Sequence, residues 1–145
     1  MKFLFIALFC AFGFISVYAQ TEKVGFTNES DKAKAVTLTL ARKDSDGNID
    51  EDIKVFSPKD IPIYCYVDLK SPAPVEVKLN FIAVKVKGIR PNSKIISISY
   101  KLKNGEDNVT FTGKPEKNWF TGTYRVDILI ENKLVVSKTF EVEEN

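Results

Sequence analysis

The sequence of 145 residues contains no histidine. This absence excludes nucleophilic catalysis by Ser-His-Asp or Cys-His groups and nearly all zinc or copper chemistry, because imidazole is the usual base and ligand in those sites. Basic and acidic residues nearly balance, at 21 to 19, so the chain lacks the strong positive bias that nucleic-acid binding requires. We therefore expect no nucleic-acid partner and no histidine-dependent enzyme.

Residues 1–19 have the pattern of a secretory signal peptide. Lys2 is the only charged residue before Glu22, and an apolar stretch follows it. Val17 and Ala19 are small residues at the positions that precede cleavage, which predicts a cut after Ala19. An uncleaved membrane anchor is the alternative, since the uncharged run is long enough to span a bilayer. We expect a secreted or periplasmic protein with no stable membrane insertion after cleavage.

Cysteine is scarce, and removal of the leader leaves only Cys65. One thiol excludes an internal disulfide, so the apolar residues alone must hold the fold together. Ile63 and Val67 share the phase of Cys65 in an alternating segment, which predicts a buried, unreactive thiol. An exposed Cys65 would instead permit pairing between two molecules.

Alternation of apolar and polar residues dominates the mature chain, and no window shows a helical period. Residues 20–35 are expected to form an extended N-terminal segment, and residues 36–145 a single domain. The alternating runs are 36–40, 61–69, 75–86, 96–102, 109–111, 124–130 and 134–142. Seven short, half-buried strands predict an all-β sandwich of two antiparallel sheets.

The third run changes phase. Its apolar residues occupy odd positions up to Phe81 and even positions from Ile82 to Val86. Because side chains alternate between the two faces of a strand, the change requires an extra residue, which predicts a β-bulge near residues 81–83. The favoured explanation is a strand that leaves one sheet for the other. The last two runs predict a hairpin with Asn132 at positive φ.

The pattern Trp119-x-x-Gly122-x-Tyr124-x-Val126, with a short turn and a last strand ending at residues 139–142, resembles the closing strands of bacterial immunoglobulin-like modules. Residues 56–60 are also similar. The resemblance covers most of residues 54–142 and implies a seven-stranded immunoglobulin-like or fibronectin III-like β-sandwich. It implies a module that binds or scaffolds, and it carries over no catalytic residue. The paired cysteines of antibody domains are missing.

Aromatic residues supply one candidate binding surface. Tyr64 and Tyr66 take the outward phase of their strand, where two rings on one face can stack on sugars or anchor a protein. The alternative is that residues 20–35 cover them. Trp119 either joins a ligand platform or packs beside Tyr124. Because neighbouring residues of a strand point to opposite faces, we expect either Trp119 or Phe120 to be exposed.

An acidic loop supplies a candidate metal site. Asp44, Asp46 and Asp50 match three ligand positions of a calcium loop, around the turn residue Gly47. The residues at the first and last ligand positions do not fit, so the sequence suggests no cofactor other than weakly bound Ca²⁺. A solvated hairpin turn is the alternative, because Asp-Gly is a common turn sequence.

Basic residues gather in the middle of the chain, where residues 54–103 contain ten basic and three acidic side chains. Lys85, Lys87 and Arg90 surround the loop at residues 88–92 and predict contact with anionic glycans, lipid headgroups or an acidic protein. Lysines on an edge strand can instead prevent sheet-to-sheet association. Asn28 and Asn108 begin N-glycosylation sequons, which matter only in a eukaryotic source.

The sequence therefore favours a secreted or periplasmic immunoglobulin-like module that binds or scaffolds without catalysis, with a protein or glycan partner at the cell surface. A small carbohydrate-binding module that uses the tyrosines and a structural Ca²⁺ is the alternative. Catalysis by paired carboxylates is disfavoured. Glu106 and Asp107, for example, are adjacent in sequence and point in opposite directions if extended.

Overall fold

A computed structural model describes residues 36–70 and 72–144, all of which lie in strands, turns or loops. The predicted leader, the segment 20–35 and Asn28 lie outside the described residues. The strands are β1 (Val36–Lys43), β2 (Ile49–Glu51), β3 (Val55–Phe56), β4 (Ile63–Leu69), β5 (Glu76–Val86), β6 (Ser93–Lys101), β7 (Asn108–Gly113), β8 (Gly122–Ile130) and β9 (Lys133–Val142). Within the described residues, no helix has the length and apolar character needed to cross a membrane.

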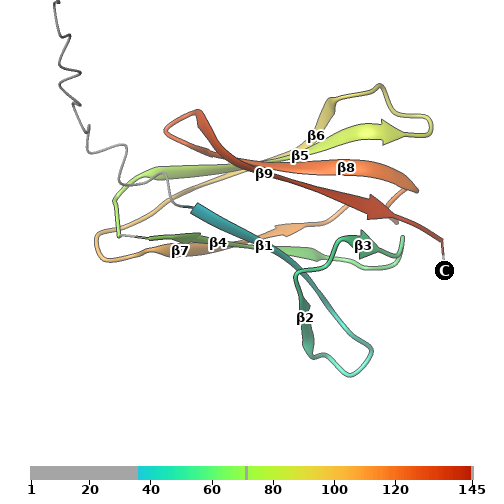
Figure 1. The fold of residues 1–145 in the computed structure, drawn as a ribbon, viewed down its shortest axis with the longest axis horizontal. Helices are drawn as coiled ribbons and strands as arrows, with labels where there is room; N and C mark the ends of the chain where they lie inside the picture. Colours follow the sequence, from blue (N-terminus) through green and yellow to red (C-terminus); the bar gives the residue numbers. More distant parts are fainter. Residues whose placement is uncertain (1–35, 71, 145) are drawn as a thin grey trace, which may run out of the picture.

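The strands form two sheets that face each other across one apolar core. The four-stranded sheet has the order β2-β1-β4-β7, and the five-stranded sheet has the order β3-β9-β8-β5-β6. Figure 1 shows the two layers, with β1, β4 and β7 below and β5, β6, β8 and β9 above, while the hairpin of β1 and β2 projects away from the lower layer. The all-β sandwich that the alternation predicts is therefore confirmed.

Nine strands form within residues 36–70 and 72–144, and the predicted number of seven is wrong. The seven predicted runs correspond to β1 and β4–β9, and the additional strands are β2 and β3, of three and two residues. Segments this short contain too little alternation to be read from a sequence. The pairing of β3 with β9 is parallel, so the five-stranded sheet is not purely antiparallel.

The chain moves from one sheet to the other between β2 and β3. Asp52 adopts a left-handed conformation at this crossing, with a φ of 56°. Its carboxylate accepts a hydrogen bond of 2.7 Å from the ammonium of Lys138 on β9, which also donates to the carbonyl of Leu38 on β1 at 3.3 Å. The lysine thereby links strands of both sheets.

The irregularity predicted in the third run is present in β5. The register of β5 with β6 shifts between Phe81 and Ile82, and its register with β8 shifts between Ala83 and Lys85. The expectation that this strand changes sheets is wrong, because β5 pairs with β6 and β8 of the same sheet on both sides of the shifts. The hairpin of β8 and β9 is also confirmed, with Asn132 at a φ of 64°.

An aromatic cluster fills one end of the core. Trp119 lies 5.5 Å from both Phe81 and Tyr124, measured between ring centroids, and Tyr124 stacks on Phe140 at 5.3 Å. Gly113 on β7 leaves room for the ring of Phe81, because a Cβ atom at that position would overlap it. Burial of such large rings is a major source of stability in a domain without a disulfide.

Tyr124 also ties the loop between β7 and β8 to the sandwich. Its hydroxyl donates a 2.8 Å hydrogen bond to the carbonyl of Phe120, four residues earlier, while its ring is 1% exposed. A tyrosine near the start of the equivalent strand, bonded to backbone a few residues upstream, is the tyrosine corner of immunoglobulin sandwiches. The second core cysteine of antibody domains would follow two residues later, where this chain has Val126.

We predict that Tyr124→Phe lowers the free energy of unfolding by about 1–2 kcal/mol, because it removes this bond and leaves a carbonyl without its partner. Urea denaturation followed by the fluorescence of Trp119 measures the change. Tyr100→Phe is the control, since that hydroxyl sits on an exposed side chain 3.4 Å from Glu106. Equal stability of the Tyr124→Phe variant and the unaltered protein would contradict the role of the corner.

Candidate functional site

The tyrosine face is built by β4, a central strand of the four-stranded sheet. Its odd-numbered side chains are fully buried between the sheets, from Ile63 to Leu69. The period of two then places Tyr64, Tyr66 and Asp68 on the outer face. The outward orientation predicted for the two tyrosines is confirmed.

The two tyrosine rings lie parallel and half-buried on this face. Their centroids are 6.4 Å apart and their planes differ by 10°. The ammonium of Lys43 lies 5.7 Å from the centroid of Tyr64, within the range of a cation–π contact. The two rings are stacked with nearly parallel planes, so they have the same orientation on the outer face.

Threonines flank the tyrosines on both neighbouring strands. The register aligns Tyr66 with Thr39 on β1 and Thr110 on β7, and it aligns Tyr64 with Thr112 on β7. Each of these side chains therefore shares the outer face with the ring beside it. The centre of the face combines aromatic surface with hydroxyl groups that both donate and accept hydrogen bonds.

A shallow hollow of about 260 Å³ lies beside Tyr66 on this face. Its lining comes from all four strands of the sheet and consists of Thr39, Glu51, Tyr66, Val67, Asp68, Asn108, Val109 and Thr110. The sequence identified only Tyr66 among these as a candidate ligand-binding residue. The others were missed because the register between strands far apart in the chain decides which of them meet, and no local pattern reports that register.

Trp119 does not belong to this face. Its side chain is 3% exposed within the aromatic core, and its indole N–H donates to the carbonyl of Asp60 at 3.1 Å. Trp119 is thus a packing residue, the second of the two roles that the sequence allowed, and its ring offers no surface to a ligand. Phe120 is 64% exposed, as expected for the neighbour of a buried residue.

The basic residues form a separate surface. Lys85 lies near the end of β5, and Lys87 and Arg90 lie in the turn between β5 and β6; all three side chains are exposed. This turn belongs to the five-stranded sheet and extends at the upper right of Figure 1. The structure therefore keeps the basic residues and the tyrosines on different sheets.

The acidic loop is the turn of the β1–β2 hairpin. The carboxylate of Asp44 accepts hydrogen bonds from the backbone N–H groups of Asp46 and Asn48, at 2.9 and 2.8 Å, and from the side chain of Asn48 at 3.2 Å. These bonds lower the pKa of the Asp44 carboxyl, and the two bonds from Asn48 have the largest effect. Asp44 therefore closes the turn, which confirms the hairpin.

The described residues contain no group of three or more acidic or cysteine side chains placed to hold a metal ion. Asp50 faces Arg42 instead, with 3.4 Å between the carboxylate and the guanidinium. Calcium binding by Asp44, Asp46 and Asp50 therefore stays a prediction from the sequence.

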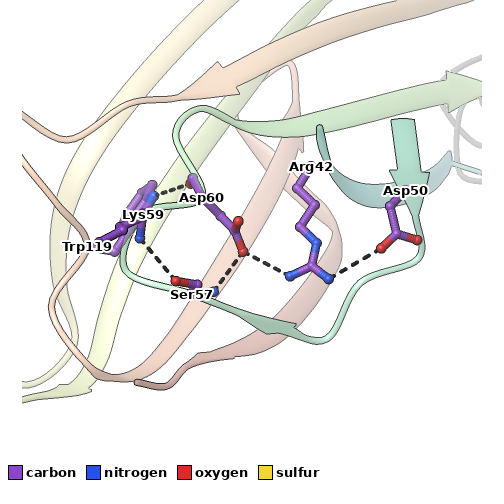
Figure 2. Close-up of polar contacts among 6 residues, drawn as sticks. All are labelled: Arg42, Asp50, Ser57, Lys59, Asp60 and Trp119. Carbon is purple, nitrogen blue, oxygen red and sulfur yellow. Dashed lines mark hydrogen bonds and ion pairs between the residues drawn. The ribbon is translucent and has the colours of Figure 1, made fainter. Parts of the chain in front are cut away.

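Arg42 anchors the segment before β4 to the four-stranded sheet. Its guanidinium donates to Asp60 at 3.0 Å, and the same carboxylate oxygen accepts the backbone N–H of Ser57 at 2.7 Å (Figure 2). Because Trp119 binds the carbonyl of Asp60, this cluster connects the hairpin, the segment and the aromatic core. Arg42 and Asp60 are bonded to each other and to further groups of the protein, so we assign the cluster a structural role.

The thiol of Cys65 is not accessible from the surface of the protein. It is a free, fully buried cysteine on the core side of β4, as the sequence predicted. Burial raises the pKa of its thiol well above the ordinary range, so the nucleophilic thiolate does not form near neutral pH.

Asp127 is the one buried charged residue among those described, and it lies on the outer side of β8. Arg125 donates to both of its oxygens, at 2.7 and 2.9 Å, and Ser137 on β9 donates a further bond of 2.7 Å. Burial alone would raise the pKa of the Asp127 carboxyl, but the bonds from Arg125 and Ser137, with the charge of Arg125, lower it below its ordinary value. The bond from Ser137 joins β8 to β9, which indicates a structural role for Asp127.

No family model and no curated protein matches the chain. Among solved structures, an immunoglobulin-like protein from Pseudomonas aeruginosa is similar over 74% of this chain and 92% of its own, with a TM-score of 0.50 and 16% sequence identity. At this identity the likeness shows the fold alone. It confirms the immunoglobulin-like sandwich that the closing motif predicted.

A second solved structure is an alkylpurine DNA glycosylase from Pseudomonas fluorescens, bound to DNA that contains an abasic-site analogue. The similarity covers 62% of this chain and 27% of the glycosylase, with a TM-score of 0.41 and 18% identity. A likeness of that size supports no statement about this chain.

We predict that Asp127→Asn lowers the free energy of unfolding at pH 7 by about 1–2 kcal/mol, because Arg125 and Ser137 lose their charged partner. Since the folded-state pKa of Asp127 is depressed, its contribution is fully present above the unfolded-state pKa of about 3.9 and is lost as the pH falls through the folded-state value.

Urea denaturation at pH 7, 4 and 3 should therefore show the difference between the variant and the unaltered protein shrinking with acidity. Asp46→Asn, on the exposed turn, is the control and should leave the free energy of unfolding at pH 7 unchanged. An Asp127→Asn penalty that stays constant from pH 7 to pH 3 would refute the ion pair as its source.

Proposed function

We propose that this protein is a non-catalytic, immunoglobulin-like binding module that works outside the cytoplasm, secreted or in the periplasm, and that it holds its partner on the tyrosine face. The observation that carries the proposal is the parallel pair of half-buried rings, Tyr64 and Tyr66, at the centre of the outer face of the four-stranded sheet. The sequence of residues 1–19 supports the location, because it has the pattern of a signal peptide.

The composition of the face supports binding over scaffolding alone. Large aromatic side chains anchor interfaces because they bury much surface while losing little conformational freedom, and they end in a polar group. Tyrosines that served only the core would not point away from it. A scaffold that used only its fold would need no such pair.

Two carboxylates paired with arginine and the buried thiol of Cys65 are poor candidates for catalytic groups. The carboxylates of Asp60 and Asp127 are each held by an arginine and by further hydrogen bonds, and Cys65 is buried. A general acid or base needs a free group within reach of a substrate. The carboxylates of Asp60 and Asp127 are bonded within the fold, and the thiol of Cys65 is out of reach of a substrate.

Retention on the cell envelope tests the proposal. The protein is expressed in its own cells, the fractions are blotted, and the mature N-terminus is sequenced; we expect the mature chain outside the cytoplasm, cleaved after Ala19. The double variant Tyr64→Ala/Tyr66→Ala should reduce binding of the purified protein to isolated envelope at least about tenfold, as loss of an interface anchor does.

Tyr100→Ala is the matched control, because it removes a partly exposed tyrosine from β6 of the other sheet. It should bind the envelope as the unaltered protein does. Recovery of the protein in the cytoplasm with residues 1–19 intact would contradict the proposed location. Equal retention of the double variant and the control would contradict the proposed binding face.

A further inference from the structure

We infer that the tyrosine face recognises a neutral, linear glycan, with one sugar unit in the hollow beside Tyr66 and the next unit along β4 against Tyr64 and Lys43. This inference rests on the proposed function, for which it names the class of ligand. It is carried by three observations: the parallel rings, a hollow lined by hydrogen-bonding groups, and the negative charge of that hollow.

The rings supply the stacking surface. A pyranose ring has an apolar face of C–H groups, which packs against the negative face of an aromatic ring in the same sense as an edge-to-face aromatic pair. Tyr64 and Tyr66 are parallel to within 10° and lie along one strand. Two consecutive units of a linear chain that runs along β4 would therefore each meet a ring of the same orientation.

The hollow supplies hydrogen bonds to hydroxyl groups. Five polar side chains other than the tyrosine line it: Thr39, Glu51, Asp68, Asn108 and Thr110. Within residues 36–70 and 72–144, the only side-chain hydrogen bond made by any of these five is that of Asn108 with Asp107, at 2.8 Å. The remaining donors and acceptors are free for a ligand that carries many hydroxyls.

The hollow is too small to enclose a large ligand. Pockets that enclose a drug-sized ligand are about 300–1,000 Å³, and this hollow of about 260 Å³ is smaller and lies on a sheet surface. A ligand here therefore keeps most of its surface in water. This arrangement suits a longer polymer that touches the face through two of its units.

The charge of the hollow selects a neutral glycan. Glu51 and Asp68 are its charged lining residues, and no basic residue lines it. Both carboxylates would repel a sulfated or uronic acid unit, while they accept hydrogen bonds from neutral hydroxyls. We expect an anionic glycan to bind instead to the exposed basic residues Lys85, Lys87 and Arg90 of the other sheet.

Calorimetric titration of the protein tests the inference with three defined probes: cellohexaose, N,N′-acetylated chitohexaose and a heparin hexasaccharide. We expect at least one of the two neutral probes to bind. Tyr66→Ala and Tyr64→Ala should each weaken that binding about tenfold, while Tyr66→Phe, which keeps the ring, stays within about threefold of the unaltered protein.

Tyr100→Ala is again the matched control and should bind the neutral probe unchanged. Urea denaturation of each variant confirms that a loss of binding is not a loss of folding. Any binding of the heparin probe should be insensitive to both Tyr→Ala variants. The inference is overturned if neither neutral probe binds, if Tyr100→Ala weakens binding as much as Tyr66→Ala, or if only heparin binds through the tyrosines.

Failure of this inference and failure of the proposed function give different results. If neither neutral probe binds but Tyr64→Ala/Tyr66→Ala still abolishes retention on the envelope, the glycan inference fails and a protein partner on the same face accounts for binding. If the double variant is also retained like the control, both proposals fail.

Discussion

The two-residue period of β4 is the constraint on which the core and the candidate site both depend. Every odd residue from Ile63 to Leu69 is buried between the sheets, and this burial leaves no freedom in the direction of Tyr64, Tyr66 and Asp68. A shift of register by one residue would place tyrosines in the core and aliphatic side chains in water. The stability of the sandwich therefore also fixes the orientation of the binding face.

The absence of a disulfide shapes the rest of the core. Cys65 lies free on β4, and Val126 follows Tyr124 at the position where antibody domains carry the second cysteine. The aromatic cluster of Trp119, Phe81, Tyr124 and Phe140 and the hydroxyl bond of Tyr124 supply cohesion at one end of the sandwich. Arg42 and Asp60 connect this cluster to the other sheet, so this ion pair serves the fold.

The sequence predicts the large features of this fold because each depends on a local period. Long alternating segments locate seven strands, the change of phase after Phe81 locates the bulge, and the motif around Trp119 and Tyr124 identifies the closing hairpin. Features set by contacts between distant segments are missed. The strands β2 and β3 are too short for a period, and the expected crossing of β5 between sheets is wrong because a bulge absorbs the extra residue.

The candidate site also combines features that a local pattern predicts with features that depend on distant contacts. Alternation alone places Tyr64 and Tyr66 outside, whereas the hollow depends on the register that brings Thr39, Asp68 and Asn108 together from three strands. The role of Trp119 depends on the path of the loop before β8, which cannot be predicted from a local sequence pattern. The separation of the basic residues from the tyrosines likewise follows from sheet order, which the sequence does not express.

Hydroxyl-radical footprinting of the protein free and bound to its envelope tests the central claim most directly, because it reports the exposure of every aromatic side chain in one experiment. The account predicts that binding protects Tyr64 and Tyr66 while Tyr100 and Phe120 react as in the free protein. Protection of Phe120 and of residues 85–90, with unchanged reactivity of Tyr64 and Tyr66, would contradict it.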